Sequence, residues 1–191
     1  MSQTNRCFIA IELPQEIQRR LCKIQSELKA TGADAKWVKQ NNIHLTLKFL
    51  GNLDSAAIAK VTAVLEQTTV HYTPFSVEIS EVGAFPTKES PRVIWVGVKE
   101  GKEKISAMVE ELENSLQNID IPKEEREFHP HITIGRLKSS FNRVHLVTKL
   151  KEITVGESMR FNVQALTLFK STLTPKGPIY EVLKAASFNA S

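Results

Sequence analysis

The sequence predicts an α+β fold built from a duplicated unit, with two lobes whose sheets face a central cleft and whose helices lie on the outer faces. Three observations predict it. Short segments alternate apolar and polar residues, longer segments carry apolar stripes at helical spacing, and this order of elements recurs after a shift of 87 residues. A chain of 191 residues can bury such a core as one bilobal domain, 1–191, with an internal repeat of roughly 1–90 and 91–191.

The first half of the chain predicts five elements. Pro14 begins a helix, and Asp54 is a good N-cap for another. Each helix carries an apolar stripe, formed by Ile17, Leu21, Ile24 and Leu28 in the first and by Ile58, Val61 and Leu65 in the second. The expected order is a strand at 7–13, a helix from Pro14 to a stop at Gly32, a strand at 44–50, a helix from Asp54 and a strand at 75–79.

The second half repeats this order and adds a closing strand. The shift carries the first helix onto residues 101–119, where Ile105, Met108, Val109, Leu112 and Leu116 again trace one helical face. The second helix maps onto a segment that begins near Asn142 and carries Leu146 and Leu150. The expected strands lie at 92–98, 131–137, 162–166 and 179–184.

Composition points to an ordinary globular protein. The chain is 41% hydrophobic and 24% charged, and its net charge of +4 mildly favours approach to a polyanion. The apolar run 8–11 is too short for a signal peptide or a membrane span. Cys7 and Cys22 form no CxxC pair, so we expect a reducing, cytoplasmic setting. We also expect a monomer with no membrane association and no obligate protein partner.

Two histidine–threonine pairs are the candidate site. In HLTL the polar His44 and Thr46 alternate with leucines, and in HITI the polar His131 and Thr133 alternate with isoleucines. Period-two alternation places each polar pair on the open face of a strand. Because the duplication places these faces on opposite walls of the cleft, both walls expose the same groups. One such strand is weak evidence for a site, but its recurrence at the equivalent position is not expected by chance.

Two imidazoles can act as general acid and general base without a metal, since the unperturbed histidine pKa of about 6.5 populates both protonation states. Threonine hydroxyls nearby can hold oxygens of a small anion such as phosphate. The chain has no HExxH, no CxxC and no glycine-rich phosphate loop. These observations predict metal-free opening of a strained cyclic phosphodiester by water. A zinc site formed by His44, His129 and His131 is the remaining metal alternative.

At these residues the chain resembles the two-histidine phosphoesterases, and among them the bacterial and archaeal RNA 2',3'-cyclic phosphodiesterases, also called 2'-5' RNA ligases. The tandem tetrads at 44–47 and 131–134 are the defining motif of that family. Flanking segments are also similar, and the resemblance covers nearly the whole chain: RCFIAIELP at 6–14, KWVKQNNIHLTLKFLG at 36–51, PRVIWVGV at 91–98, PHITIGR at 130–136 and LTLFKSTLTPKGPIYEVL at 166–183.

The resemblance implies hydrolysis of RNA 2',3'-cyclic phosphate ends to a 2'-phosphate, with no cofactor and no metal, and for some members reversible 2'-5' joining of RNA ends. It implies His44 and His131 as the catalytic pair. We assign His44 as acid on the departing 3' oxygen and His131 as base on water, and the near symmetry of the site leaves the exchanged roles open. Thr46 and Thr133 would hold phosphate oxygens.

The two copies differ five residues after each histidine. The resemblance implies that Phe49 stacks on the terminal base and that Arg136 binds phosphate. Strict alternation instead buries both side chains, unless the strands bend near Gly51 and Gly135. Four further expectations concern residues nearby and at the surface: Lys48 lies on the His44 face, His129 is a neighbour of the site, Trp37 and Trp95 serve packing, and His71 and His145 lie on the surface.

Two rival functions remain open from the sequence. One is cleavage of small nucleotides, such as 2'-5' oligoadenylates or cyclic-phosphate nucleotides. The other is a module that binds RNA ends in the cleft without turnover.

Overall fold

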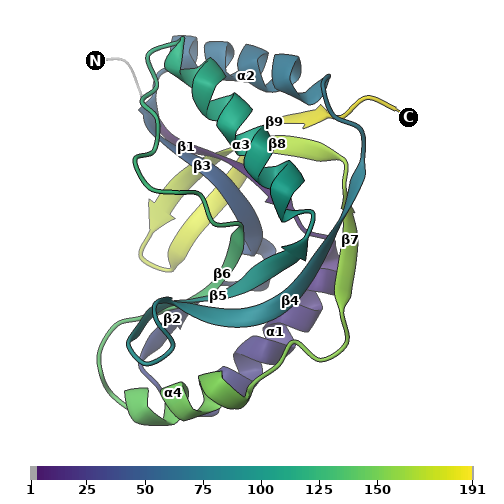
Figure 1. Ribbon diagram of the computed structural model, residues 1–191. Coiled ribbons are helices and arrows are strands. Elements are labelled where there is room, and N and C mark those ends of the chain that lie inside the picture. The colour runs from purple at the N-terminus through teal and green to yellow at the C-terminus, as the bar shows by residue number, and fades with distance from the viewer. Residues whose placement is uncertain (1–3, 191) are drawn as a thin grey trace.

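The computed structural model describes residues 4–190, so the ends of the predicted domain, 1–3 and 191, lie outside the described residues. Helices and strands form an upper and a lower lobe (Figure 1). In chain order the elements are β1 (Asn5–Glu12), α1 (Gln15–Lys29), β2 (Ala35–Trp37), the 3₁₀ turn η1 (Gln40–Asn42), β3 (His44–Leu53), α2 (Ser55–Thr69), β4 (Phe75–Pro86), β5 (Pro91–Glu100), α3 (Lys102–Gln117), β6 (His131–Leu137), α4 (Arg143–Glu152), β7 (Met159–Val163), β8 (Ala165–Thr174) and β9 (Gly177–Ser187).

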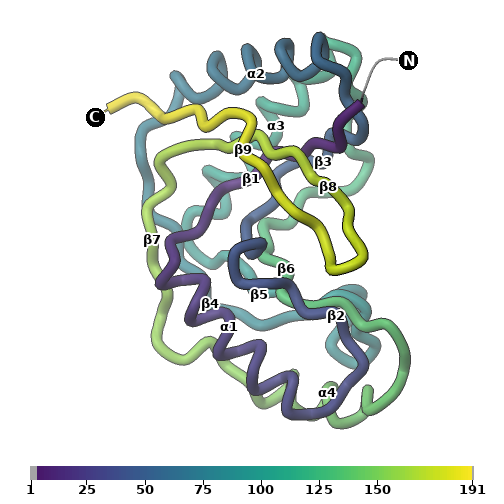
Figure 2. The backbone as a smooth tube through the Cα atoms, turned by 180° about the vertical axis from the view of Figure 1, so that it is seen from behind, coloured from purple at the N-terminus to yellow at the C-terminus, as the bar shows by residue number. Residues whose placement is uncertain are grey.

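Each lobe contains one antiparallel sheet. The upper sheet has the strand order β3-β1-β8-β9 and the lower sheet the order β2-β6-β5-β4-β7. Helices α2 and α3 lie over the upper sheet, and α1 and α4 lie at the lower sheet (Figures 1 and 2). This arrangement confirms the predicted α+β fold with two sheets and outer helices.

The two lobes exchange elements between the halves of the chain. Strand β4 from the first half pairs with β5 in the lower sheet, and β8 from the second half pairs with β1 in the upper sheet. Likewise α1 joins the lower lobe and α3 the upper lobe (Figure 1). Each sheet therefore needs strands from both halves, which differs from the simpler expectation of one sheet for each repeat. The repeat boundary near residue 90 stays a prediction.

Local sequence features form the predicted helices. The apolar stripe of α1 is buried, with Leu21 and Leu28 fully inaccessible. Asp54 caps α2, because its Oδ1 accepts a hydrogen bond from the Ala57 backbone N–H at 2.8 Å. Helix α4 follows Asn142 at its N-cap position. These starts agree with the sequence prediction.

The predicted strand at 162–166 is divided in the structure. Strand β7 ends at Val163 in the lower sheet, and β8 begins at Ala165 in the upper sheet. The Gln164 carbonyl accepts a hydrogen bond from Phe188 N at 2.8 Å, in register with the β8–β9 ladder. Gln164 is thus the point at which the chain passes between lobes.

Candidate active site

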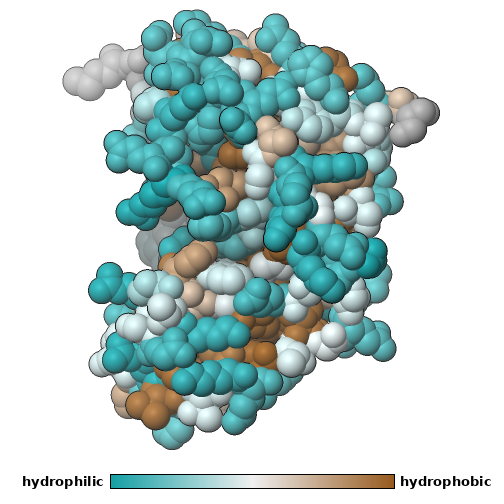
Figure 3. All heavy atoms as spheres, in the orientation of Figure 1, coloured by the Kyte–Doolittle hydropathy of each residue, from teal (hydrophilic) through white to brown (hydrophobic). Residues whose placement is uncertain are grey.

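The two histidine–threonine pairs lie where the lobes meet. Strand β3 of the upper sheet and β6 of the lower sheet approach each other, and the surface is indented between the lobes at the left margin of Figure 3. His44, Thr46, His131 and Thr133 are all half-buried, whereas the apolar residues between them are buried. The alternation therefore turns both pairs away from the two cores, as predicted.

Each imidazole lies against its own wall of aromatic side chains. The His44 ring stacks on Phe8 with centroids 4.8 Å apart and meets the edge of Tyr180 at 5.3 Å. The His131 ring lies edge-on to Phe85 at 5.0 Å and to Trp95 at 6.4 Å. These contacts leave each ring little freedom to turn.

The same backbone contact orients both rings. Nδ1 of His44 lies 2.8 Å from the Asn42 carbonyl oxygen, and Nδ1 of His131 lies 2.7 Å from the His129 carbonyl oxygen. A carbonyl only accepts hydrogen bonds, so both Nδ1 atoms carry a proton. In the neutral ring Nε2 then holds a lone pair, which is the atom that can accept or return a proton.

Burial favours the neutral form of both rings. It lowers the pKa of His44 to about 4, against the opposing effect of the Asn42 carbonyl. Burial also lowers the pKa of His131, and the positive charge of Arg136 lowers it further. A bound phosphate anion has the opposite effect, because negative charge near an imidazole stabilises its protonated form.

The low pKa of these histidines predicts a loss of stability as the pH falls. Between pH 6.5 and 5 the unfolded chain takes up a proton on His44 that the folded chain resists, so stability decreases by up to about 1.4 kcal/mol per pH unit. The lowered pKa of His131 acts in the same direction. The pKa values of Glu78 and Glu89 are lowered from 4.5, so protonation of these carboxyls affects stability only at lower pH.

Urea unfolding at pH 7, 6 and 5 measures this prediction. The loss between pH 7 and 5 should be smaller in a His44→Gln, His131→Gln double variant than in the unchanged chain. Equal losses in both proteins would contradict the lowered pKa values.

A β-bulge in each of the two strands, β3 and β6, brings the fifth residue after the histidine back to the open face. In β3, Ala10 lies opposite Thr46 and Ile9 opposite Lys48, so Leu47 is an extra residue. Leu47 and Lys48 are therefore both buried, and Phe49 is 62% exposed on the side of His44 and Thr46. The expectation that Phe49 is buried by strict alternation is wrong for this reason.

The second strand repeats this bulge at the equivalent place. In β6, Trp95 lies opposite Thr133 and Ile94 opposite Gly135, which makes Ile134 the extra residue. Arg136 is consequently exposed on the face of His131 rather than buried. The bulge in β6 adjoins Gly135, one of the two expected sites, and in β3 a second register shift, at Leu50, adjoins the other, Gly51.

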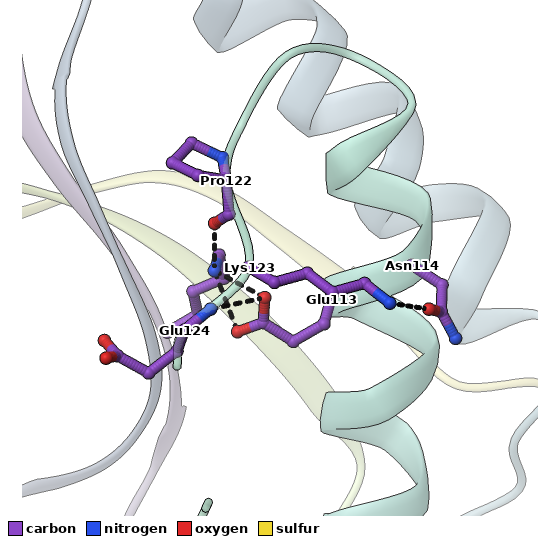
Figure 4. A network of polar contacts seen from close by, with 6 residues as sticks. Glu113, Asn114, Pro122, Lys123 and Glu124 are labelled. Carbon is purple, nitrogen blue, oxygen red and sulfur yellow. Dashed lines mark hydrogen bonds and ion pairs between the residues drawn. The ribbon is translucent and has the colours of Figure 1, made fainter. Parts of the chain in front are cut away.

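Lys48 was expected on the His44 face, and that expectation is wrong. Its side chain enters the upper core, where Nζ bonds to the Glu113 carboxylate at 2.6 and 2.8 Å and to the Pro122 carbonyl at 2.9 Å. Figure 4 shows Glu113 on α3, turned toward Pro122 and the backbone nitrogen of Glu124. Lys48 is therefore not available to contact a ligand in the cleft.

A family model described as LigT-like phosphoesterase matches the chain twice in succession, at residues 11–95 and 96–180. The chain belongs to the LigT-like phosphoesterases. A Thermotoga maritima protein named RNA 2',3'-cyclic phosphodiesterase is 37% identical over 183 residues, which are 96% of this chain and 95% of that protein. A protein of the same name from Methanocaldococcus jannaschii is 35% identical over 182 residues, 94% of this chain and 98% of its own.

Solved structures show the same fold. A Thermus thermophilus protein superposes with a TM-score of 0.83 at 28% identity, covering 97% of this chain and 98% of its own. Escherichia coli LigT in complex with 3'-AMP has a TM-score of 0.82 at 22% identity, covering 98% and 99%. The LigT-like architecture therefore extends over nearly the whole chain.

The charge of Arg136 acts on groups in both walls of this LigT-like site. Its positive charge lowers the pKa of His131 on the lower wall. It also lowers that of Tyr180 on the upper wall, against the larger effect of burial, which raises it. Because Tyr180 touches the His44 ring, one guanidinium lies near the surroundings of both histidines.

The zinc alternative lacks a suitable ligand group. Within residues 4–190 no three His, Cys, Asp or Glu side chains come together in a way that could hold a metal ion. His129, the third proposed ligand, is exposed, and its Nε2 lies 4.0 Å from Glu127. A separate hollow of about 670 Å³ beside α1, lined by Arg19, Lys23 and other charged residues, contains neither His44 nor His131.

The remaining predicted residues serve packing or lie on the surface. Trp37 packs on Gly135, where an added Cβ would meet its ring at 2.8 Å, and Trp95 covers Gly83 in the same way at 2.2 Å. His71 is exposed and pairs with Glu111 at 2.6 Å, and His145 is exposed on α4.

The sequence analysis did not predict the aromatic side chains that contact the two histidines, nor the polar side chains that bond to the bulged strands. Phe8 and Trp95 are 87 positions apart, so the internal repeat could have identified them as equivalent aromatic residues beside the two histidines. No sequence pattern predicted the role of Gln25 in α1, because glutamine is seldom buried. Its Nε2 donates hydrogen bonds to the Val38 and Ile134 carbonyls at 2.8 and 2.7 Å.

Proposed function

We propose that this chain hydrolyses RNA ends that carry a 2',3'-cyclic phosphate and leaves the phosphate on the 2' oxygen. The relatives from T. maritima and M. jannaschii carry the name of that activity. The observation that carries the proposal is the duplicated orientation of His44 and His131, each with Nδ1 bonded to a backbone carbonyl and Nε2 available.

The reaction requires one group that removes a proton from water and one group that donates a proton to the leaving 3' oxygen. Nε2 of His131 accepts a proton from water while the water oxygen forms a bond to phosphorus. The bond between phosphorus and the 3' oxygen breaks, and Nε2 of protonated His44 donates a proton to that oxygen. The anionic substrate supplies the charge that raises the pKa of His44 from about 4, so that the acid is protonated when substrate is bound.

Other side chains of the site suit the bound phosphate and base. Thr46 and Thr133 lie on the faces of the two histidines, where their hydroxyls donate to nonbridging oxygens. Arg136 adds a charge-assisted contact. Phe49, exposed beside Thr46, stacks on the terminal base. No metal and no cofactor takes part in these steps. With a 5' hydroxyl in place of water, the same groups would join RNA ends through a 2'-5' linkage.

We further propose a cytoplasmic monomer. Both cysteines, Cys7 and Cys22, are free, which suits a reducing compartment. Among the described residues no helix is both long and apolar enough to cross a bilayer.

A single incubation tests the proposal. An oligoribonucleotide ending in a 2',3'-cyclic phosphate is treated with the protein in the presence of EDTA, and the product is compared with 2'- and 3'-phosphate standards by chromatography. We expect a 2'-phosphate and a rate that EDTA does not change. Tight binding without product at any pH would instead favour the RNA-end binding module, and loss of activity in EDTA would favour a metal site.

A further inference from the structure

We propose that the wall formed by the β8–β9 hairpin is a second binding surface for the RNA strand, which holds the nucleotides that precede the cyclic phosphate. The inference rests on the proposed function and adds to it a preference for oligonucleotides over mononucleotides. It depends on exposed apolar side chains, on their register with the catalytic wall and on the cations opposite them.

A row of apolar side chains crosses the whole upper sheet on its cleft face. Phe8 lies opposite Phe49 on one side and opposite Phe169 on the other, and Phe169 lies opposite Val182. The middle of the row is buried, whereas Phe49 and Val182 at its two ends are 62% and 51% exposed. With neighbouring strands about 4.8 Å apart, the ends are separated by roughly 14 Å, which is wider than one stacked base.

The hairpin extends this wall beyond the catalytic histidine. Leu173 follows Phe169 by four residues in an unbroken register, so it faces the same side, and it is 66% exposed. Tyr180 lies between these side chains and His44, with its ring 4.9 Å from Phe8. The exposed apolar surface is therefore continuous with the site that takes the terminal nucleotide.

The tip of the hairpin is tied to η1, the turn that leads into β3. Asn42, which also orients His44, donates from Nδ2 to the Pro178 carbonyl at 2.9 Å. Figures 1 and 2 both place this end of the hairpin beside β2 of the lower lobe. The hairpin thus forms a fixed part of the cleft wall.

Positive charge lies where the phosphates of such a strand would pass. Lys36 of β2 lies opposite Arg136 in the lower sheet, so both side chains are on the cleft face, and both are exposed. Arg6 of the upper sheet is exposed opposite Ser171, and its charge opposes the rise that burial causes in the pKa of Tyr180. Apolar side chains on the upper wall, with Arg6 on the same wall and Lys36 and Arg136 on the lower wall, suit a single strand. Its bases would pack on the apolar side chains and its backbone would run near the cations.

The measured quantity is the ratio of kcat/KM for an oligoribonucleotide with a 2',3'-cyclic phosphate end to kcat/KM for a 2',3'-cyclic mononucleotide. We expect a ratio well above one for the unchanged chain. Leu173→Ser combined with Val182→Ser should lower the ratio about tenfold, because the two changes remove apolar area that a base would cover. Ile179→Ser is the matched control, since Ile179 is 60% exposed on the same hairpin but faces the opposite side, and it should leave the ratio unchanged.

The outcomes separate this inference from the proposed function. If neither substrate reacts, the proposed function fails. If both react with equal kcat/KM, or if Ile179→Ser lowers the ratio as much as the double variant, the proposed function stands and the second surface is rejected. A dimer in gel filtration that Leu173→Ser dissociates would assign the wall to a second copy of the chain and also overturn the inference.

Discussion

Replacing His44 or His131 with alanine is expected to lower kcat/KM for a cyclic-phosphate oligonucleotide by at least about 100-fold. Acid and base steps are each typically worth about 10²- to 10⁴-fold. In the proposed mechanism the two rings act in one proton transfer sequence, so the double variant should be little slower than the slower single variant. Initial rates at a substrate concentration well below KM measure this effect.

The control for these variants is His145→Ala. His145 is exposed on α4, which lies at the end of the lower lobe away from the upper sheet (Figure 1), so its replacement should leave the rate within about twofold. Thermal unfolding of all variants separates lost chemistry from lost structure. Activity retained in both His44→Ala and His131→Ala would reject the two-histidine mechanism.

The two roles can be separated with an activated aryl phosphodiester. Its leaving group needs no proton, so the variant that lacks the acid should recover a large part of the lost rate, whereas the variant that lacks the base should not. We expect the recovery in His44→Ala. Recovery in His131→Ala instead would exchange the two assignments while leaving the pair intact.

Much of the site follows from local rules that a sequence reveals. Period two predicts the open faces of His44 and His131, and the 87-residue shift predicts that they belong to equivalent strands. The two bulges could not be predicted from these rules. An extra residue at Leu47 or Ile134 reverses the alternation after it, and neither residue differs in type from an ordinary strand residue.

Side chains from distant elements lie against both bulges, and this is why the bulges could not be predicted locally. Gln25 of α1 bonds to the carbonyl of Ile134 in the lower lobe. Lys48 itself is drawn into the upper core by Glu113 of α3. In each lobe the partner comes from a helix supplied by the other half of the chain. Helices exchanged between the lobes therefore supply polar partners at both bulges, and the bulges turn Phe49 and Arg136 to the open face.

Lys48→Met is expected to destabilise the fold by about 3 kcal/mol or more. The side chains of Lys48 and Glu113 are only 4% and 13% exposed, and removal of one partner from a buried pair leaves the other charge without compensation. The matched control is Lys149→Met, because Lys149 pairs with Glu27 at 2.8 Å on the surface, with side chains 33% and 54% exposed. That change should cost no more than about 1 kcal/mol. Urea unfolding at pH 7 measures both.

A second substitution distinguishes a lost ion pair from a stranded charge. If the cost of Lys48→Met comes from the unpaired Glu113 carboxylate, then Lys48→Met combined with Glu113→Met removes both charges and should recover most of the lost stability. The double variant still lacks the bond from Lys48 to the Pro122 carbonyl, so the segment that leads to His131 loses a contact with β3. A double variant that is stable but has a lower kcat/KM would therefore mean that the buried pair positions the two catalytic strands. A Lys48→Met cost as small as that of Lys149→Met would contradict the buried-pair account.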